Sequence, residues 1–458
     1  MLPGVPGLKR ALFLLFLFLV ASLTLPSCGG YNSNSTSTGT NLTNRAFFSE
    51  NVSAGTIGAG VYIVDAQNDL RAAIAPISAG NTPGMMVLTP NRNQTLVFSA
   101  AGDQLTVISN GTESATGQVT LPGFTESIVV SPDSSTAYAA VPTATVVGQS
   151  PGVVKVISLS SSAFTGEVDV PAVHYLSIDH SGNRILAFSD NADLVAVITP
   201  SNIGIGTAVT SVGGFDRPVA AFFSSDDTIA YVLNCGAECG GTQASIQQLN
   251  LTNNTLGPSV PVCAPGPNPQ QCAGPAAGSV ALVNGSTMYV AGTPNSAELP
   301  SQPCIPQTTA APTCGLLTIV DLPSMTVTSS GTIITDGYHN RMALGANGQL
   351  FIGARTCTEI NAVNPGDEVR GCLSIYNTQN AKVGSIQPNA VTIPPANGEV
   401  TGIQPIAKRT VVYVVQNGAL GIYDTTTDAL ELNPRDPNHP GQIFNLVGQF
   451  VDVKTPDF

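Results

Sequence analysis

Short apolar runs alternate with polar turns along almost the whole chain after residue 45. The runs are rich in Val, Ile, Ala, Thr and Tyr, and clusters of Gly, Pro, Asn, Asp and Ser separate them. Runs of this kind predict β-strands joined by tight turns. No stretch shows the apolar period of about 3.6 residues that marks an amphipathic helix. The pattern therefore predicts an all-β fold.

The predicted strands recur in a fixed order. The first type is SIVVSPD (residues 127–133), a strand that ends in a turn, and a second apolar run such as TAYAAV (136–141) follows it. A third run such as VKVISLSSS (154–162) ends in another turn, and a weaker outer strand completes the unit. First strands begin near Met85, Ser127, Tyr175, Val219, Ser279, Met342 and Gly402. Four antiparallel strands repeated every 40 to 60 residues, roughly, are typical of a β-propeller.

The two ends of the chain are predicted to share one blade. RAFFSE (45–50), GVYIVDAQND (60–69) and AAIAPIS (72–78) have the character of second, third and fourth strands without a first. GQFVDVKT (448–455) has the character of a first strand without successors. Joining the two ends closes the ring without a free sheet edge, and the count is then eight blades. Seven blades are the alternative, if the C-terminal strand packs elsewhere.

Three segments resemble the repeats of the YVTN-type propeller family, over roughly residues 47–453. They are IVVSPDSSTAYAAV (128–141), FFSSDDTIAYVLN (222–234) and LTIVDLPSM (317–325). The resemblance implies a propeller scaffold, and an eighth blade departs from the seven that are common in that family. Members include extracytoplasmic proteins of unsettled function and relatives of lactonases, so the resemblance implies little about chemistry.

The net charge of −13 argues against binding to nucleic acid. Only 16 Lys and Arg residues are present, they are scattered, and two of them lie in the first ten residues. A protein that neutralises phosphates needs a cluster of such residues. No phosphate-binding loop, HExxH zinc motif or EF-hand loop occurs, and the chain has no Trp. We therefore expect neither a metal nor a cofactor.

The N-terminus has the features of a bacterial export signal. Lys9 and Arg10 precede the apolar segment 11–21, and Leu25-Pro26-Ser27-Cys28 resembles the lipobox at which a lipid is attached to the cysteine. An ordinary signal peptide or an uncleaved anchor with an incidental cysteine is the alternative. Gly29 after the cysteine implies sorting to the outer membrane.

The export signal, the composition after it and the strand repeats together predict three parts of the chain. Residues 1–27 are the signal peptide, residues 28–45 are a Gly-, Ser-, Thr- and Asn-rich tether, and residues 46–458 are the propeller. We expect the protein in the bacterial cell envelope, bound to the membrane only through lipid on Cys28.

The other eight cysteines form close pairs in the sequence. The predicted disulfides are Cys235–Cys239, Cys263–Cys272, Cys304–Cys314 and Cys357–Cys372. An exported chain favours disulfides over metal or redox thiols, and no pair has the spacing of a zinc site. Each pair brackets a loop between second and third strands, or between one blade and the next. These two kinds of connection emerge on one face, where we predict all the long insertions; the opposite face is predicted to carry only tight turns.

The segments that enter the first strands lie on the same predicted face, around the mouth of the central channel. Their polar residues are Glu126, His174, Asp216, Arg217, Tyr338, His339, Arg341 and Glu399, and Asp336 accompanies them. His174 and His339 are predicted to occupy equivalent repeat positions. Arg could bind a carboxylate, and His could act as a base. Residues at blade junctions can also simply satisfy backbone groups, and this alternative stays open.

Two functions of different classes fit the sequence. The first is a monomeric binding or scaffold protein that contacts a protein or glycan partner through the disulfide-braced face. The second is an enzyme, such as a lactonase-like hydrolase, with its site at the channel mouth. The scarcity of His and the lack of an organised catalytic motif favour the first, and no catalytic residue is assigned.

Overall fold

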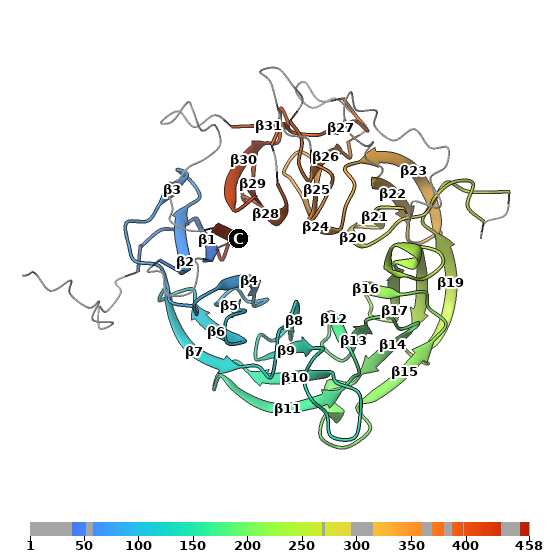
Figure 1. The fold of residues 1–458 in the computed structure, drawn as a ribbon, viewed down its shortest axis with the longest axis horizontal. Helices are drawn as coiled ribbons and strands as arrows, with labels where there is room; N and C mark the ends of the chain where they lie inside the picture. Colours follow the sequence, from blue (N-terminus) through green and yellow to red (C-terminus); the bar gives the residue numbers. More distant parts are fainter. Residues whose placement is uncertain are drawn as a thin grey trace, which may run out of the picture. The chain divides into compact units, whose positions relative to one another are not determined.

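The apolar runs form antiparallel strands in eight four-stranded sheets, which are arranged as the blades of a ring (Figure 1). The computed structural model describes residues 39–51, 58–267, 271–294, 315–359, 369–379, 387–396, 398–431 and 449–457. The ring belongs to the compact unit Gly39–Phe458. Among the described residues, helix is confined to two short 3₁₀ turns, and none of it has the length and apolar character of a membrane span.

The blades of the first half of the ring each run from an inner to an outer strand in chain order. They are β4 (Pro83–Leu88), β5 (Gln94–Ser99), β6 (Gln104–Ser109) and β7 (Ser114–Thr120); β8 (Ser127–Val130), β9 (Thr136–Val141), β10 (Val153–Ser158) and β11 (Ala163–Asp169); β12 (Val173–Ile178), β13 (Ile185–Ser189), β14 (Leu194–Ile198) and β15 (Val209–Gly213); β16 (Pro218–Phe223), β17 (Ile229–Asn234), β18 (Ser245–Asn250) and β19 (Thr255–Pro261). The 3₁₀ turns are η1 (Pro200–Asn202) and η2 (Gly236–Cys239).

The next three blades follow the same order. They are β20 (Val280–Asn284), β21 (Thr287–Gly292), β22 (Gly315–Asp321) and β23 (Thr326–Ile334); β24 (His339–Leu344), β25 (Gln349–Ala354), β26 (Leu373–Asn377) and β27 (Val391–Thr392); β28 (Val400–Pro405), β29 (Val411–Gln416), β30 (Ala419–Asp424) and β31 (Ala429–Leu430).

The eighth blade joins the two ends of the chain, as predicted. The C-terminal strand β32 (Gln449–Lys454) is its inner strand, and β1 (Arg45–Asn51), β2 (Gly60–Asp65) and β3 (Leu70–Arg71) follow outward. The count of eight excludes the seven-bladed alternative. The outer strand β3 ends before the predicted segment 72–78, which contributes only an isolated bridge between Val61 and Ile77.

Ion pairs strengthen this closure. The Arg45 guanidinium pairs with Asp457 beyond the end of β32 and, at 2.9 Å, with Glu113 of the neighbouring blade. One side chain thus connects the start of the closing blade, its C-terminal end and the next blade.

The core lies between neighbouring blades, and this explains why the middle strands are apolar on both faces. In β5 every residue after Gln94 is buried, and β29 is buried throughout. One apolar cluster joins Leu96 and Leu105 of one blade to Ile128 and Ala139 of the next. A strand covered on both sides reads as a continuous apolar run, which is the pattern seen in the sequence.

Four inner strands share an irregularity that shapes the channel mouth. In β12, β16, β24 and β28 the pairing register shifts after the first residue, so the second residue lies in a bulge. The first residues are buried; they are Val173, Pro218, His339 and Val400. The bulged residues are His174, Val219, Asn340 and Thr401. A bulge redirects side chains, so neighbouring positions have different environments.

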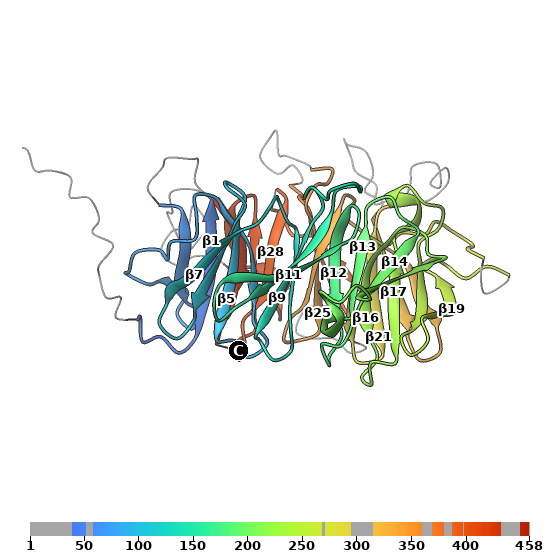
Figure 2. The same cartoon turned by 90° about the horizontal axis from the view of Figure 1, so that it is seen from below.

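Figure 2 shows the ring edge-on, and the strands run from one of its faces to the other. The prediction that every long insertion lies on the disulfide-bearing face is wrong. The connection β14–β15 (199–208, with η1) joins a third strand to a fourth strand, and it leaves from the opposite face. The fourth strand is the exposed edge of each blade, so an insertion before it disturbs little of the core.

Candidate functional site

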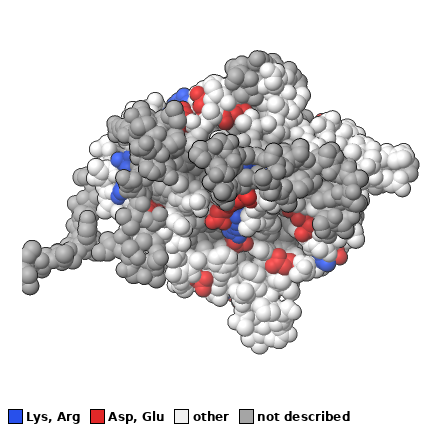
Figure 3. All heavy atoms as spheres, turned by 45° about the horizontal axis from the view of Figure 1, so that its top comes forward, with Lys and Arg blue, Asp and Glu red and all other residues white. Residues whose placement is uncertain are grey.

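A cavity of about 400 Å³ opens where the inner strands begin. Its lining comes from every blade except β28–β31. Glu126, Tyr338, His339 and Arg341, which the sequence places at the channel mouth, are four of its lining residues. Figure 3 shows acidic and basic side chains gathered at the hollowed centre of this face. The position is typical of a propeller ligand site, since several blades can each contribute a side chain.

An ion pair crosses the mouth. The Glu126 carboxylate accepts a hydrogen bond of 2.7 Å from Nη1 of Arg355. Glu126 precedes β8 and Arg355 follows β25, and these strands belong to blades on opposite sides of the ring (Figure 1). The pair is half-exposed, with 22% of the Glu126 side chain and 46% of the Arg355 side chain accessible. It is therefore available to a ligand that offers better partners.

His174 lies between two carboxylates at the same mouth. Its Nε2 is 2.9 Å from Glu126 and its Nδ1 is 2.8 Å from Asp190. The hydrogen bond to Glu126, and then that to Asp190, raises the pKa of His174 above its ordinary value of 6.5. The same hydrogen bond from His174, with Arg355, lowers the pKa of Glu126 to about 2. The imidazole also stacks on Tyr175 with ring centroids 4.1 Å apart.

Two tyrosines from different blades meet beside this network. The Tyr175 and Tyr338 hydroxyls are 2.7 Å apart, although the residues are 163 positions apart in the sequence. Tyr338 lines the mouth cavity and two neighbouring cavities of about 200 and 310 Å³. The Tyr338 side chain therefore separates three neighbouring cavities and lines all of them.

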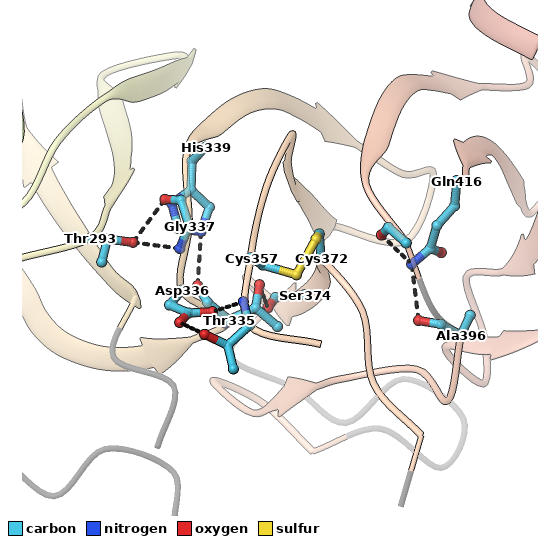
Figure 4. Close-up of a disulfide and its surroundings, with 12 residues drawn as sticks. Thr293, Thr335, Asp336, Gly337, His339, Cys357, Cys372, Ser374, Ala396 and Gln416 are labelled. Carbon is cyan, nitrogen blue, oxygen red and sulfur yellow. Dashed lines mark hydrogen bonds between the residues drawn. A yellow bond between two sulfur atoms is a disulfide. The ribbon is translucent and has the colours of Figure 1, made fainter. Parts of the chain in front are cut away.

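The Cys357–Cys372 disulfide holds the segment that carries Arg355 (Figure 4). The Arg355 N–H donates to the Tyr338 carbonyl at 2.8 Å, and the Tyr338 N–H donates to the Thr356 carbonyl at 3.0 Å. Gly337, at φ +108°, permits this approach, since a Cβ there would lie 1.6 Å from the Thr356 oxygen. The disulfide-braced loop and the channel mouth are thus one structural unit.

His339 does not share the environment of His174, contrary to the prediction of equivalent repeat positions. His339 is the residue before the bulge and aligns with Val173, so its ring is 1% exposed while its neighbour Asn340 takes the place of His174. Its Nε2 donates to the Thr335 carbonyl at 2.9 Å (Figure 4), and among the described residues no hydrogen-bond partner is found for its buried Nδ1. Burial lowers the pKa of His339 to about 4, so the ring is neutral.

Two further predicted residues organise a loop instead of facing the mouth cavity. Asp216 accepts hydrogen bonds from the Thr242 and Gln243 backbone and from the Thr242 hydroxyl. Burial opposes ionisation of Asp216, but these hydrogen bonds outweigh it and lower the pKa. Arg217, at φ +55°, pairs with Asp193 at 3.3 Å and lines the smaller neighbouring cavity of His174.

Arg341 faces the mouth cavity, and Glu399 does not. Glu399 is exposed just before β28 and is not a lining residue of the three cavities. Arg341 donates from Nε to the Thr401 carbonyl at 3.0 Å and from Nη1 to the Asn340 carbonyl at 3.2 Å. The Arg341 side chain therefore lies over the start of the one blade that does not line the cavity.

Three predicted disulfides are formed in the predicted pairing, with Cys235–Cys239 and Cys263–Cys272 beside Cys357–Cys372. Cys28, Cys304 and Cys314 lie outside the described residues. Cys357, Glu359 and Cys372 come close enough to suggest metal ligands, but both thiols are in the disulfide. Within the described ranges no other group of potential ligands is this close.

Sequence reasoning missed Arg355, Asp190 and Tyr175. Each lies near a residue that was identified, since Tyr175 and Asp190 belong to the β12–β13 hairpin and Arg355 comes two positions before Cys357. The proximity of Arg355 to a predicted disulfide was a usable signal. The contact between Arg355 and Glu126 could not be predicted from the sequence, because the two residues are 229 positions apart.

No protein-family model matches the sequence, and no curated protein matches it either. Solved structures do share the fold. Dihydro-heme d1 dehydrogenase NirN in complex with DHE matches with a TM-score of 0.56 and 12% identity, over 91% of this chain and 75% of that chain. Kuenenia stuttgartiensis hydrazine synthase matches with a TM-score of 0.54 and 14% identity, over 78% of this chain and 99% of that chain. At these identities the likeness shows a β-propeller and nothing finer.

Proposed function

We propose that this chain is a binding protein of the bacterial cell envelope, which holds its protein or glycan partner at the mouth of the propeller channel. The observation that carries the proposal is the mouth cavity of about 400 Å³, crossed by the Glu126–Arg355 pair. A half-exposed ion pair can exchange its partners for those of a ligand at small cost. Tyr338 and Phe124, 37% and 45% exposed, add apolar contact area at the rim.

The state of the two histidines favours binding over hydrolysis. A general base needs a free nitrogen lone pair within reach of its substrate. Both ring nitrogens of His174 face carboxylates, and His339 is buried away from solvent. A lactonase-like hydrolase would therefore have to rearrange the mouth before either histidine could act.

The sequence supports placing this site outside the cytoplasm. The lipobox-like segment at Cys28 and the three disulfides formed in the described residues fit an oxidising compartment. Outer-membrane anchoring and membership of the YVTN-type repeat family belong to the proposal. Mass spectrometry of the mature N-terminus tests the anchor: a lipid-modified Cys28 is expected, and a free N-terminus at another residue would contradict it.

Photo-crosslinking in intact cells tests the binding site. Phe124 is replaced by p-benzoylphenylalanine, which puts the reactive group at the cavity rim. His180, whose side chain is 64% exposed on the opposite face, receives the same replacement as a matched control. We expect a discrete adduct from position 124 that is absent from position 180 and lost when Arg355→Met is added. The same adducts from both positions, or none from position 124, would contradict the proposal.

A further inference from the structure

Arg341 lines the mouth cavity, and among the described residues no acidic partner is found for its charge. It is the third residue of β24 and pairs in register with Gly353, as Tyr175 pairs with Phe188 in its own blade. Its two hydrogen bonds go to neutral main-chain carbonyls, so three of the five guanidinium N–H donors remain for another partner. In the part of the chain that the structure describes, no carboxylate lies within ion-pair distance of Arg341.

Four other arginines of the propeller differ from Arg341 in this respect. Acidic partners are found for Arg45, Arg217, Arg355 and Arg409. A half-buried guanidinium without a counter-ion is costly in a low-dielectric hollow, unless a ligand provides the negative charge.

The cavity as a whole is positive in a strongly acidic protein. The chain carries a net charge of −13. The charged lining residues are Arg341 and Arg355 with Glu126, and His339 is neutral, so the lining carries two positive charges and one negative charge. This local excess attracts an anion against the field of the surrounding protein.

The rest of the lining suits an apolar group. Phe98 and Phe124 lie edge to face with ring centroids 5.6 Å apart, and Met85, Val280 and Val451 line the same hollow. A purely ionic ligand would leave this surface unused. An anion attached to an apolar or aromatic body would contact both parts of the cavity.

We infer that the mouth cavity binds a carboxylate attached to an apolar body: the carboxylate pairs with Arg341, and the apolar body packs against Phe98 and Phe124. The planar guanidinium matches the two oxygens of a carboxylate, which gives Arg341 a geometric advantage over a lysine at this position. The inference rests on the binding function proposed above and names its ligand class. The carboxylate can belong to a free acid or to the C-terminus of a peptide.

The test uses a matched pair of probes, 3-phenylpropionate and its uncharged amide, titrated by calorimetry into the intact propeller. The wild-type protein is expected to bind the acid at least about tenfold more tightly than the amide. Arg341→Met should reduce that ratio to about one, and Arg341→Lys should leave an intermediate ratio. Arg184→Met, at an exposed turn of the opposite face, is the control and should keep the wild-type ratio. Thermal unfolding confirms that each variant is folded.

The inference is overturned if the wild type binds acid and amide with equal affinity, or if the preference for the acid survives Arg341→Met. In both cases the cavity still binds a ligand, so the proposed binding function is unaffected. Failure of both probes to bind would also overturn the inference. The crosslinking experiment uses neither compound, so it judges the binding function separately. A phenylalanine-terminated dipeptide, with a free or an amidated C-terminus, then distinguishes a peptide end from a free acid.

Discussion

Two polar contacts on opposite faces of the propeller differ in how far apart their partners lie in the chain. On the face opposite the disulfides, Asp226 bonds to the Ser224 hydroxyl at 2.7 Å and to the Thr228 N–H at 3.2 Å, all within five consecutive residues. On the disulfide-bearing face, Glu126 bonds to Arg355, 229 positions away. The first contact belongs to a single turn, whereas the second joins blades on opposite sides of the channel. A ligand that enters the mouth can therefore disturb only the second contact.

The largest effect is expected from removing the disulfide that holds the cross-channel contact. The Cys357→Ala/Cys372→Ala double variant opens a loop of 15 residues and should lower the free energy of unfolding by about 3 kcal/mol. It also frees Arg355 from the position in which it meets Glu126. Chemical denaturation followed by circular dichroism measures the first effect, and crosslinking from position 124 measures the second.

The control for this variant is Cys263→Ala/Cys272→Ala, which opens a loop of 9 residues on the same face. The cost should be similar, about 2–3 kcal/mol, because loop length enters only logarithmically. This disulfide holds no residue of the ion pair, so crosslinking should persist. Equal loss of crosslinking in both double variants would mean that the mouth depends on general loop order.

The second prediction concerns the buried histidine on the mouth side. Burial lowers the pKa of His339 to about 4, against 6.5 in the unfolded chain, so the folded state binds fewer protons below pH 6.5. Stability is therefore lost as the pH falls from 6.5 towards 4, by about 2 kcal/mol at pH 5. His339→Val, which copies the residue at the equivalent position of β12, should remove this pH-dependent loss, while at pH 7 it costs about 1–3 kcal/mol because the buried Thr335 carbonyl loses its donor.

Denaturation curves of both proteins at pH 7 and pH 5 measure the difference, in which the contributions of other groups cancel. His180→Val, on the opposite face, should keep the wild-type pH dependence. If His339→Val unfolds with the wild-type pH dependence, then His339 is not neutral and buried in solution.

The same contrast between local and long-range contacts explains what the sequence could predict. Strand order, the shared blade and three disulfides follow from patterns within about 60 residues, because each repeat folds from local turns and continuous apolar runs. The shared blade could be predicted because the two ends of the chain carry complementary parts of one repeat. Local chemistry also identified Glu126, His174 and Arg341 as a group, since repeat position alone brings them to one face.

The missed features depend on backbone detail or on distant partners. The bulge after the first residue of β12 and β24 decides that His174 is partly exposed between Glu126 and Asp190 while His339 is buried, and the apolar pattern does not reveal it. Arg355 reaches Glu126 only because their blades are opposed in a ring of eight. The insertion at residues 199–208 was not predicted, because Gly- and Pro-containing turns vary in length without altering the strand pattern.

The third prediction separates the contributions of the two carboxylates that face His174. Glu126→Gln removes the largest cause of its raised pKa, so the pKa of His174 should fall substantially, whereas Asp190→Asn should cause a smaller fall. A raised pKa means that the stabilisation from this pair is complete below pH 6.5 and disappears as the pH rises through the folded pKa. Histidine NMR over pH 5 to 9 measures both shifts. A larger fall in Asp190→Asn would reverse the assignment.

The smallest effects are expected from two local turns on the face opposite the disulfides, and they test the comparison most directly. Asp133→Ala and Asp226→Ala each remove a carboxylate bonded only within its own exposed turn, so each should cost less than about 1 kcal/mol. Because the two turns share no partner, the cost of the double variant should equal the sum of the single costs within about 0.5 kcal/mol. Glu126→Gln with Arg355→Met should deviate from additivity, since each single change already breaks the same pair. If the two turns prove to be coupled, or if the ion-pair variants prove to be additive, then the distinction between contacts confined to one turn and contacts that cross the channel does not hold.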